Sequence, residues 1–120
     1  MYTIKEWKTW IEDQATALFG SISTPEGDSR FSYNDGLNTV GQLQFVGDWL
    51  GTDVVNCKSV KLRKDSFIEL LNLEVIRLSF MANHTMINHP DSQIERAILE
   101  SKKEAFKTTS NWIEENFKGM

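Results

Sequence analysis

The side chains best suited to acid–base chemistry near neutral pH are two histidines, His84 and His89. A hydrolytic site needs a nucleophile, a base and an orienting group together, and the sequence has no Gly-x-Ser-x-Gly motif to supply the nucleophile. The histidines are five residues apart, whereas a helical zinc site uses a spacing of four. The sequence therefore predicts a protein that is not an enzyme and holds no metal or cofactor.

Three pairs of carboxylates could in principle do acid–base work: Glu12 with Asp13, Asp48 with Asp53, and Glu114 with Glu115. Adjacent residues on a helix point about 100° apart. We therefore interpret the adjacent pairs as ordinary solvated helix surface. The single cysteine, Cys57, excludes an internal disulfide bond and a cysteine-based zinc site.

Acidic and basic side chains are segregated along the chain, whose net charge is −4. Between Lys8 and Lys58, Arg30 is the only basic residue. A basic run follows at residues 58–64, but no aromatic residues lie within it to stack on bases, so we expect no nucleic-acid partner. The acidic stretch is either an ordinary solvated surface or a face that attracts a basic protein.

Aromatic residues lie among the carboxylates of this acidic stretch. Aromatic anchors surrounded by charged residues are common in protein-binding patches. Alternatively, Phe31 and Trp49 simply fill the core. The residues predicted to bind a partner are Asp28, Tyr33, Asp35, Asp48, Trp49 and Asp53.

The two ends of the chain have the apolar spacing of helices. Apolar residues recur every three or four positions over residues 3–19, Thr3 and Glu6 can form a capping box, and Gly20 can end the helix. Ser92 and Glu95 suggest a second capping box before a helix over residues 92–117, with a break possible at residues 108–110.

The middle of the chain is harder to interpret. Residues 20–36 are typical of a loop, with a possible short strand at 30–33. Glycines and alternating apolar residues favour strands at 40–46, 58–63 and 74–80. Ser66 and Glu69 could instead cap a buried helix over 66–82, with Ile68, Leu71, Val75 and Leu78 in one row. We expect a single α+β domain over residues 1–120, with two amphipathic helices on a small antiparallel sheet, and an all-α bundle is the alternative.

The stretch VGQLQFVGDWLG at residues 40–51, followed by Asn56, resembles small bacterial proteins in which a strand enters a turn of the pattern Gly, Asp or Glu, Trp, Phe or Leu, Gly. These are similar to immunity proteins against polymorphic or contact-dependent toxins. The resemblance implies strands and β-hairpins here, and a role in binding a toxin.

The predicted function is therefore an immunity or inhibitor protein. It would neutralise a cognate bacterial toxin, expected to be a basic nuclease domain, by occluding the active site. The alternative is a non-catalytic regulatory or adaptor protein of bacterial or phage origin. Charged residues in the first ten positions and the lack of an apolar run of about 20 residues predict neither export nor a membrane partner, so we expect a cytoplasmic protein.

Overall fold

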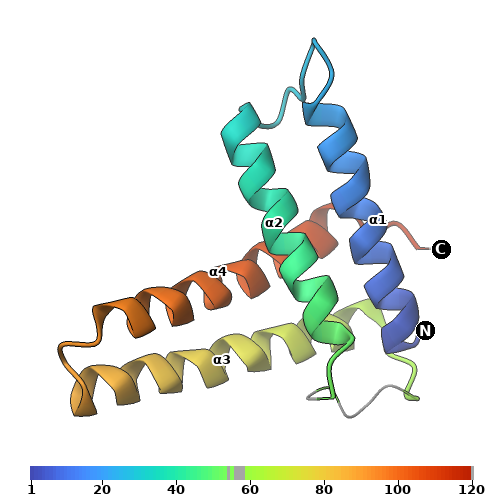
Figure 1. Cartoon of the computed structure of the whole chain (residues 1–120). Coiled ribbons are helices and arrows are strands. Elements are labelled where there is room, and N and C mark those ends of the chain that lie inside the picture. Colours follow the sequence, from blue (N-terminus) through green and yellow to red (C-terminus); the bar gives the residue numbers. More distant parts are fainter. Residues whose placement is uncertain (54, 56–58, 120) are drawn as a thin grey trace. The chain divides into compact units, whose positions relative to one another are not determined.

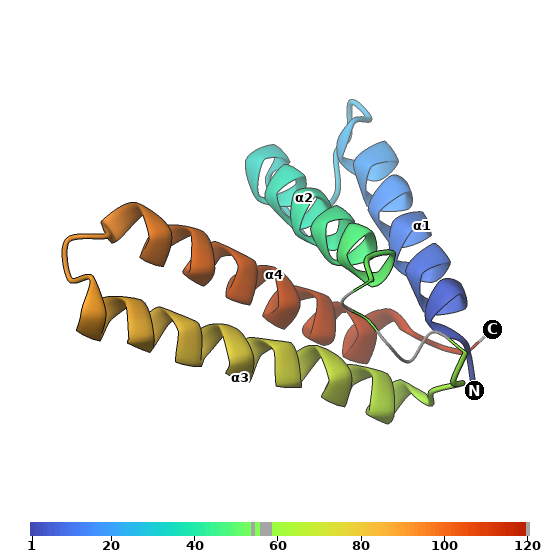
Figure 2. The ribbon, with the colours of Figure 1, turned by 60° about the horizontal axis from the view of Figure 1, so that its bottom comes forward.

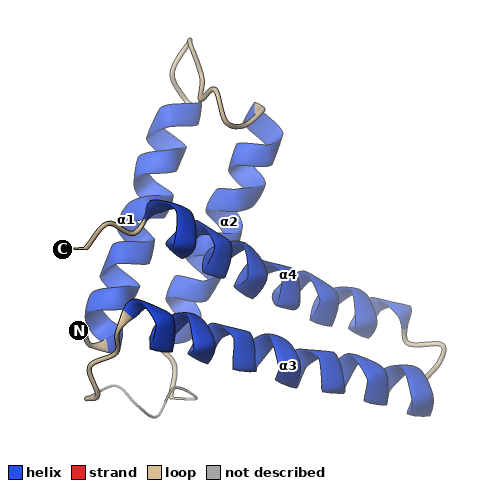
Figure 3. Cartoon of the chain, turned by 180° about the vertical axis from the view of Figure 1, so that it is seen from behind, coloured by secondary structure: helices blue, strands red, loops and turns tan. Residues whose placement is uncertain are grey.

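The computed structural model describes residues 1–53, 55 and 59–119, and all regular secondary structure in those ranges is helical (Figures 1 and 3). The helices are α1 (Ile4–Ile22), α2 (Tyr33–Leu50), α3 (Lys64–Asn88) and α4 (Gln93–Asn116). They form two compact units, Met1–Arg63 and Lys64–Met120, each of which is a pair of helices. The expectation of a single domain over residues 1–120 stays a prediction.

In the first unit, α1 begins as its sequence predicts. The Thr3 hydroxyl accepts a hydrogen bond from the backbone N–H of Glu6 at 3.2 Å, and the Glu6 carboxylate accepts one from the Thr3 backbone at 3.0 Å. The Thr3 hydroxyl also donates to the Glu6 carboxylate, at 3.0 Å, and the hydrogen bonds that this carboxylate accepts from the Thr3 backbone and hydroxyl lower the pKa of Glu6. The predicted capping box is thus confirmed, but the helix continues past Gly20 to Ile22.

Two glycines of α2 bring it close to α1, and the two helices lie side by side in Figures 1 and 2. A Cβ atom at Gly36 would lie 2.7 Å from Cγ2 of Ile22, and one at Gly47 would lie 3.1 Å from Cγ of Glu12. The apolar residues of α2 that share this side are buried: Val40, Leu43, Val46 and Leu50. The glycines therefore serve helix packing rather than breaking the helix.

Trp7 is the largest fully buried side chain of this unit. Its indole N–H donates to the backbone carbonyl of Leu62 at 3.1 Å, and its ring meets that of Tyr2 edge to face at 5.6 Å. Tyr2 and Leu62 also exchange two backbone hydrogen bonds, of 3.0 and 2.7 Å. The chain around Leu62, which follows α2, is thereby hydrogen-bonded to the start of α1.

In the second unit, α3 and α4 run antiparallel and are joined by a short link at residues 89–92 (Figure 2). The Ser110 hydroxyl donates to the Asn72 side-chain oxygen at 3.3 Å, and the Lys64 ammonium lies 3.4 Å from a Glu114 carboxylate oxygen. These polar contacts connect the two helices beside a buried apolar row, which consists of Phe67, Leu71, Leu78, Phe106 and Ile113.

The α+β prediction is wrong, because the expected strands at 40–46 and 74–80 lie inside α2 and α3. Residues 59–63 form no strand either, and Lys58 lies outside the described residues. The expected strand at 30–33 is a turn followed by the start of α2. In each helical case, burial of a row of apolar residues outweighs the helix-weakening glycines or the alternating pattern. The all-α alternative is the one the structure supports.

Several helix boundaries also differ from their predictions. The alternative helix over 66–82 exists but is longer, so Ser66 lies within α3 rather than at its cap. Ser92 is at the N-cap of α4, but its side chain makes no capping hydrogen bond. The break considered at 108–110 does not occur, and the Thr109 hydroxyl donates to the Ala105 carbonyl at 2.9 Å within a continuous helix.

Over the described residues, none of the helices has the length and apolar character that crossing a bilayer requires.

Candidate functional site

The structure separates the six predicted partner-binding residues into two groups. Asp28, Tyr33 and Asp35 lie in the α1–α2 loop and the first turn of α2, whereas Asp48, Trp49 and Asp53 lie at and just after the end of α2. Asp48 is thirteen positions after Asp35 on the same helix, a distance of about 20 Å at 1.5 Å per residue. The two groups therefore lie at opposite ends of α2.

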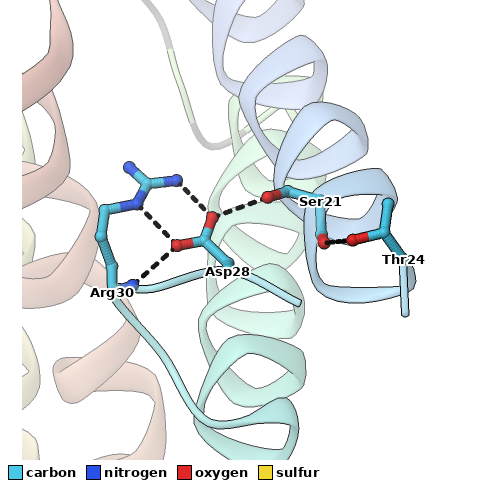
Figure 4. A network of polar contacts seen from close by, with 4 residues as sticks. All are labelled: Ser21, Thr24, Asp28 and Arg30. Atoms are coloured by element: carbon cyan, nitrogen blue, oxygen red, sulfur yellow. Dashed lines mark hydrogen bonds and ion pairs between the residues drawn. The ribbon is translucent and has the colours of Figure 1, made fainter. Parts of the chain in front are cut away.

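Asp28 is held tightly by its own loop (Figure 4). The Arg30 guanidinium donates to both carboxylate oxygens, at 3.1 and 2.9 Å, and the Arg30 backbone N–H adds a bond of 2.9 Å. The Ser21 hydroxyl at the end of α1 donates a fourth, at 2.8 Å. The hydrogen bonds from Arg30, followed by that from Ser21, hold the pKa of Asp28 well below its usual range. Asp28 thus fixes the loop shape, and its charge is balanced by Arg30.

Asp35 belongs to the first turn of α2 and helps to start that helix. The backbone N–H of Asp35 donates to the Ser32 hydroxyl at 3.2 Å, which makes Ser32 the N-cap. A carboxylate in the first turn interacts favourably with the positive end of the helix dipole. Tyr33, beside it, is exposed. The carboxylates of this first group therefore have structural roles in positioning α2.

The second group contains an additional residue that the sequence analysis missed. Phe45, Asp48 and Trp49 are three and four residues apart, so they lie along the same side of α2. Phe45 and Asp48 are exposed, Trp49 is half-buried, and the exposed Asp53 follows the helix. The predicted strand over 40–46 placed Phe45 on the same side as Leu43, but in the helix Leu43 is buried and Phe45 is not. We call Phe45, Asp48, Trp49 and Asp53 the acidic–aromatic end of α2.

The acidic–aromatic end carries a negative potential for two reasons. The C-terminal carbonyls of a helix have a partial negative charge, and Asp48 adds a full charge within the last turn, which contains no basic residue. Lys8 of α1 lies beside Gly51 at this end, and its ammonium pairs with Glu12 at 3.0 Å. This end of the helix is suited to contact with a basic group next to an aromatic ring.

The residues considered for catalysis have ordinary surroundings. His84 is exposed on α3, and its ring contacts the Asn88 side chain at 3.0 Å, while His89 follows the end of the helix. Within the described ranges, no three His, Cys, Asp or Glu side chains are grouped so that they could hold a metal ion. Glu114 and Glu115 are exposed near the end of α4, and Cys57 lies outside the described residues.

Comparison with known proteins adds no assignment: no protein-family model, curated protein or solved structure matches the chain.

Proposed function

We propose that this protein acts by binding, as a cytoplasmic inhibitor or immunity protein that neutralises a basic bacterial toxin, and that the acidic–aromatic end of α2 makes the contact. The observation that carries the proposal is that Asp48 and Asp53 flank Trp49 along the chain at the negative end of α2, a helix without lysine or arginine. A nuclease must bind phosphates, so its active-site cleft is basic. An acidic protein surface can occupy such a cleft.

The physical character of the three side chain types supports this assignment. Aromatic residues with restricted rotamers contribute large contact areas at a small cost in conformational entropy, and Trp49 is already half-buried. Carboxylates at the rim accelerate association with a basic partner through long-range attraction. Phe45, one turn before Trp49, extends the apolar part of the contact.

The proposal assigns different roles to the residues at the other end of α2. Asp28 is balanced by Arg30 and closes the loop, and Asp35 lies in the capped first turn. These residues would support binding indirectly, by fixing where α2 begins. Tyr33, which is exposed, would add a peripheral contact.

The test is a growth-rescue assay in which this chain is co-expressed with toxic basic proteins, beginning with any that a neighbouring gene encodes. Reversing two charges with Asp48→Lys and Asp53→Lys is expected to abolish rescue. In direct binding measurements, each reversal should lower affinity at least about tenfold, or about 1.4 kcal/mol, and reduce the salt dependence. Trp49→Ala should also weaken binding without changing the salt dependence.

The matched control makes the same charge change elsewhere in the first unit. Asp13→Lys with Glu26→Lys alters two exposed carboxylates, one on α1 and one in the loop, and rescue should persist. Equal affinity of the Asp48→Lys, Asp53→Lys variant and the unaltered protein would show that another surface makes the contact. Equal loss of rescue in both double variants would show that net charge, rather than this site, is responsible.

A further inference from the structure

Helix α3 is apolar on two opposite sides. The side buried in the hairpin includes Leu71 and Leu78. Two residues after each of these are Leu73 and Phe80, which are 59% and 70% exposed. A step of two residues turns about 200° around a helix, so this second row lies opposite the buried one. The row, which we call the outer face of α3, consists of Leu73, Ile76, Phe80 and Ile87, each at least half exposed.

The spacing of the outer face is that of a helix that packs against another helix. Positions 73, 76, 80, 83 and 87 alternate in steps of three and four, which is the heptad pattern of knobs-into-holes packing. Four of the five are large apolar residues, and the fifth is Asn83. A row of this kind spans about 21 Å of helix. Its shape therefore favours an α-helical partner over a flat or irregular one.

The charges around the outer face favour a second copy of the chain as that partner. Between residues 70 and 88 the only Asp, Glu, Lys or Arg residues are Glu74 and Arg77, and these two form an ion pair with each other. Two copies of an acidic chain can meet here without opposing like charges. A strongly charged partner would find no complementary charge, and a membrane-surface helix would need a cationic polar face that this segment lacks.

The residue before this row indicates the direction of pairing. Glu69 lies four residues before Leu73, on the same side of α3, and is exposed. Parallel pairing of two copies would bring the two Glu69 carboxylates together, which is unfavourable. Antiparallel pairing places them at opposite ends of the contact, with Phe80 of both copies near the two-fold axis. Leu73 of one copy then lies near Ile87 of the other.

We propose that this chain forms a symmetric dimer through antiparallel contact of the outer faces of α3. Stable specific interfaces bury about 800 Å² on each partner, and one helix face with four large apolar residues at its centre provides somewhat less. The dimer should therefore be weak, with a dissociation constant in the micromolar range. The proposed dimer uses only α3, so its test is independent of the proposed toxin contact on α2.

Analytical ultracentrifugation of the full chain at concentrations from about 1 to 500 µM tests the dimer, because a micromolar dissociation constant lies within that range. We expect the sedimentation coefficient to rise with concentration for the unaltered protein. Phe80→Glu should raise the dissociation constant at least about a hundredfold by placing like charges at the two-fold axis. Ile87→Gln, a milder change, gives the same readout if Phe80→Glu fails to fold. The matched control is Ile94→Glu on α4, which introduces the same charge at a large apolar residue that is 77% exposed. The Ile94→Glu variant should dimerise as the unaltered protein does.

Cysteine cross-linking tests the direction of pairing. In a Cys57→Ser background, Phe80→Cys should form a disulfide-linked dimer on mild oxidation, whereas Leu73→Cys should not, because antiparallel pairing keeps the two copies of residue 73 far apart. Efficient cross-linking at residue 73 would overturn the antiparallel arrangement. A protein that stays monomeric at 500 µM, or that binds neutral lipid vesicles through Phe80 while monomeric, would overturn the dimer.

Discussion

The two helical hairpins use their apolar residues differently. In α2, one side is apolar and buried, and the opposite side carries polar residues such as Asn34, Asn38 and Gln44 around Phe45. In α3, the buried side and the opposite side are both apolar. A helix with one apolar stripe can bury that stripe against one neighbouring helix. A helix with two apolar stripes and one neighbour leaves the second stripe exposed. The first hairpin is thus suited to presenting polar and acidic groups, and the second to associating with another helix.

The largest expected effect on the free energy of unfolding comes from replacing one aromatic residue in each hairpin by alanine. Trp7→Ala should lower the free energy of unfolding by about 3–5 kcal/mol, because it opens a cavity at a fully buried position and leaves the Leu62 carbonyl without its indole donor. Phe80→Ala should lower it by less than about 0.5 kcal/mol, because the ring is exposed.

Both values come from urea unfolding followed by circular dichroism, at concentrations below a few micromolar so that association does not contribute. Weaker dimerisation is the expected consequence of Phe80→Ala at higher concentrations. If Phe80→Ala and Trp7→Ala destabilise the dilute protein equally, then the outer face of α3 is buried within a single chain, and the contrast between the hairpins disappears.

An intermediate effect is expected from adding a methyl group at two glycines of α2. Gly36→Ala should lower stability by about 1–3 kcal/mol, since the new Cβ would lie 2.7 Å from Cγ2 of the buried Ile22. Gly41→Ala should raise stability by about 0.5–1 kcal/mol, because nothing lies within 4 Å of its Cβ position and alanine favours the helix.

Thermal unfolding measures the stability of both variants, and the Tm should shift by about 4 °C for each kcal/mol in a protein of this size. A lower Tm for Gly36→Ala together with a higher Tm for Gly41→Ala would show that α1 and α2 pack as closely in solution as the structure indicates. Stabilisation by both substitutions would mean that the two helices are further apart near Gly36, and that the first hairpin is as loosely covered as the outer side of α3.

The same contrast explains which elements could be predicted from sequence. The terminal helices α1 and α4 have apolar residues at helical spacing with polar residues between them, so their period is unambiguous. In α3, Ile76, Leu78 and Phe80 alternate like the inward side of a strand, but Leu78 is buried while the other two are on the outer face. A helix that is apolar on two opposite sides can show the alternating apolar pattern of a strand. The heptad spacing of the outer face was the signal that could have distinguished the helix from a strand.

The strand prediction for α2 failed for a different reason. Interior glycines weaken an isolated helix, and nothing in a single sequence shows that Gly36 and Gly47 face a neighbouring helix closely. The candidate site depended on this assignment. Residue types alone drew attention to Asp48 and Trp49, but their grouping with Phe45 requires helical geometry, and their distance from Asp35 requires the length of α2.

The smallest effect concerns the loop that fixes the start of α2. Because Arg30 and Ser21 hold the pKa of Asp28 below its unfolded value of 3.8, its ionised form stabilises the folded protein. That contribution is complete above the unfolded pKa and is lost as the pH falls below about 4 towards the folded pKa. Asp28→Asn should therefore lower stability slightly at neutral pH and make the decline in stability below pH 4 less steep, as measured by urea unfolding at a series of pH values.

A carboxylate NMR titration separates this local effect from general acid unfolding. In Arg30→Gln, Asp28 should titrate at a higher pH than in the unaltered protein, because the guanidinium that donates to both of its oxygens is gone. If Asp28 titrates identically in both, its carboxylate is not committed to the loop and is available to a partner. Both ends of α2 would then offer acidic contacts, and the division of the first hairpin into a supporting end and a binding end would have to be abandoned.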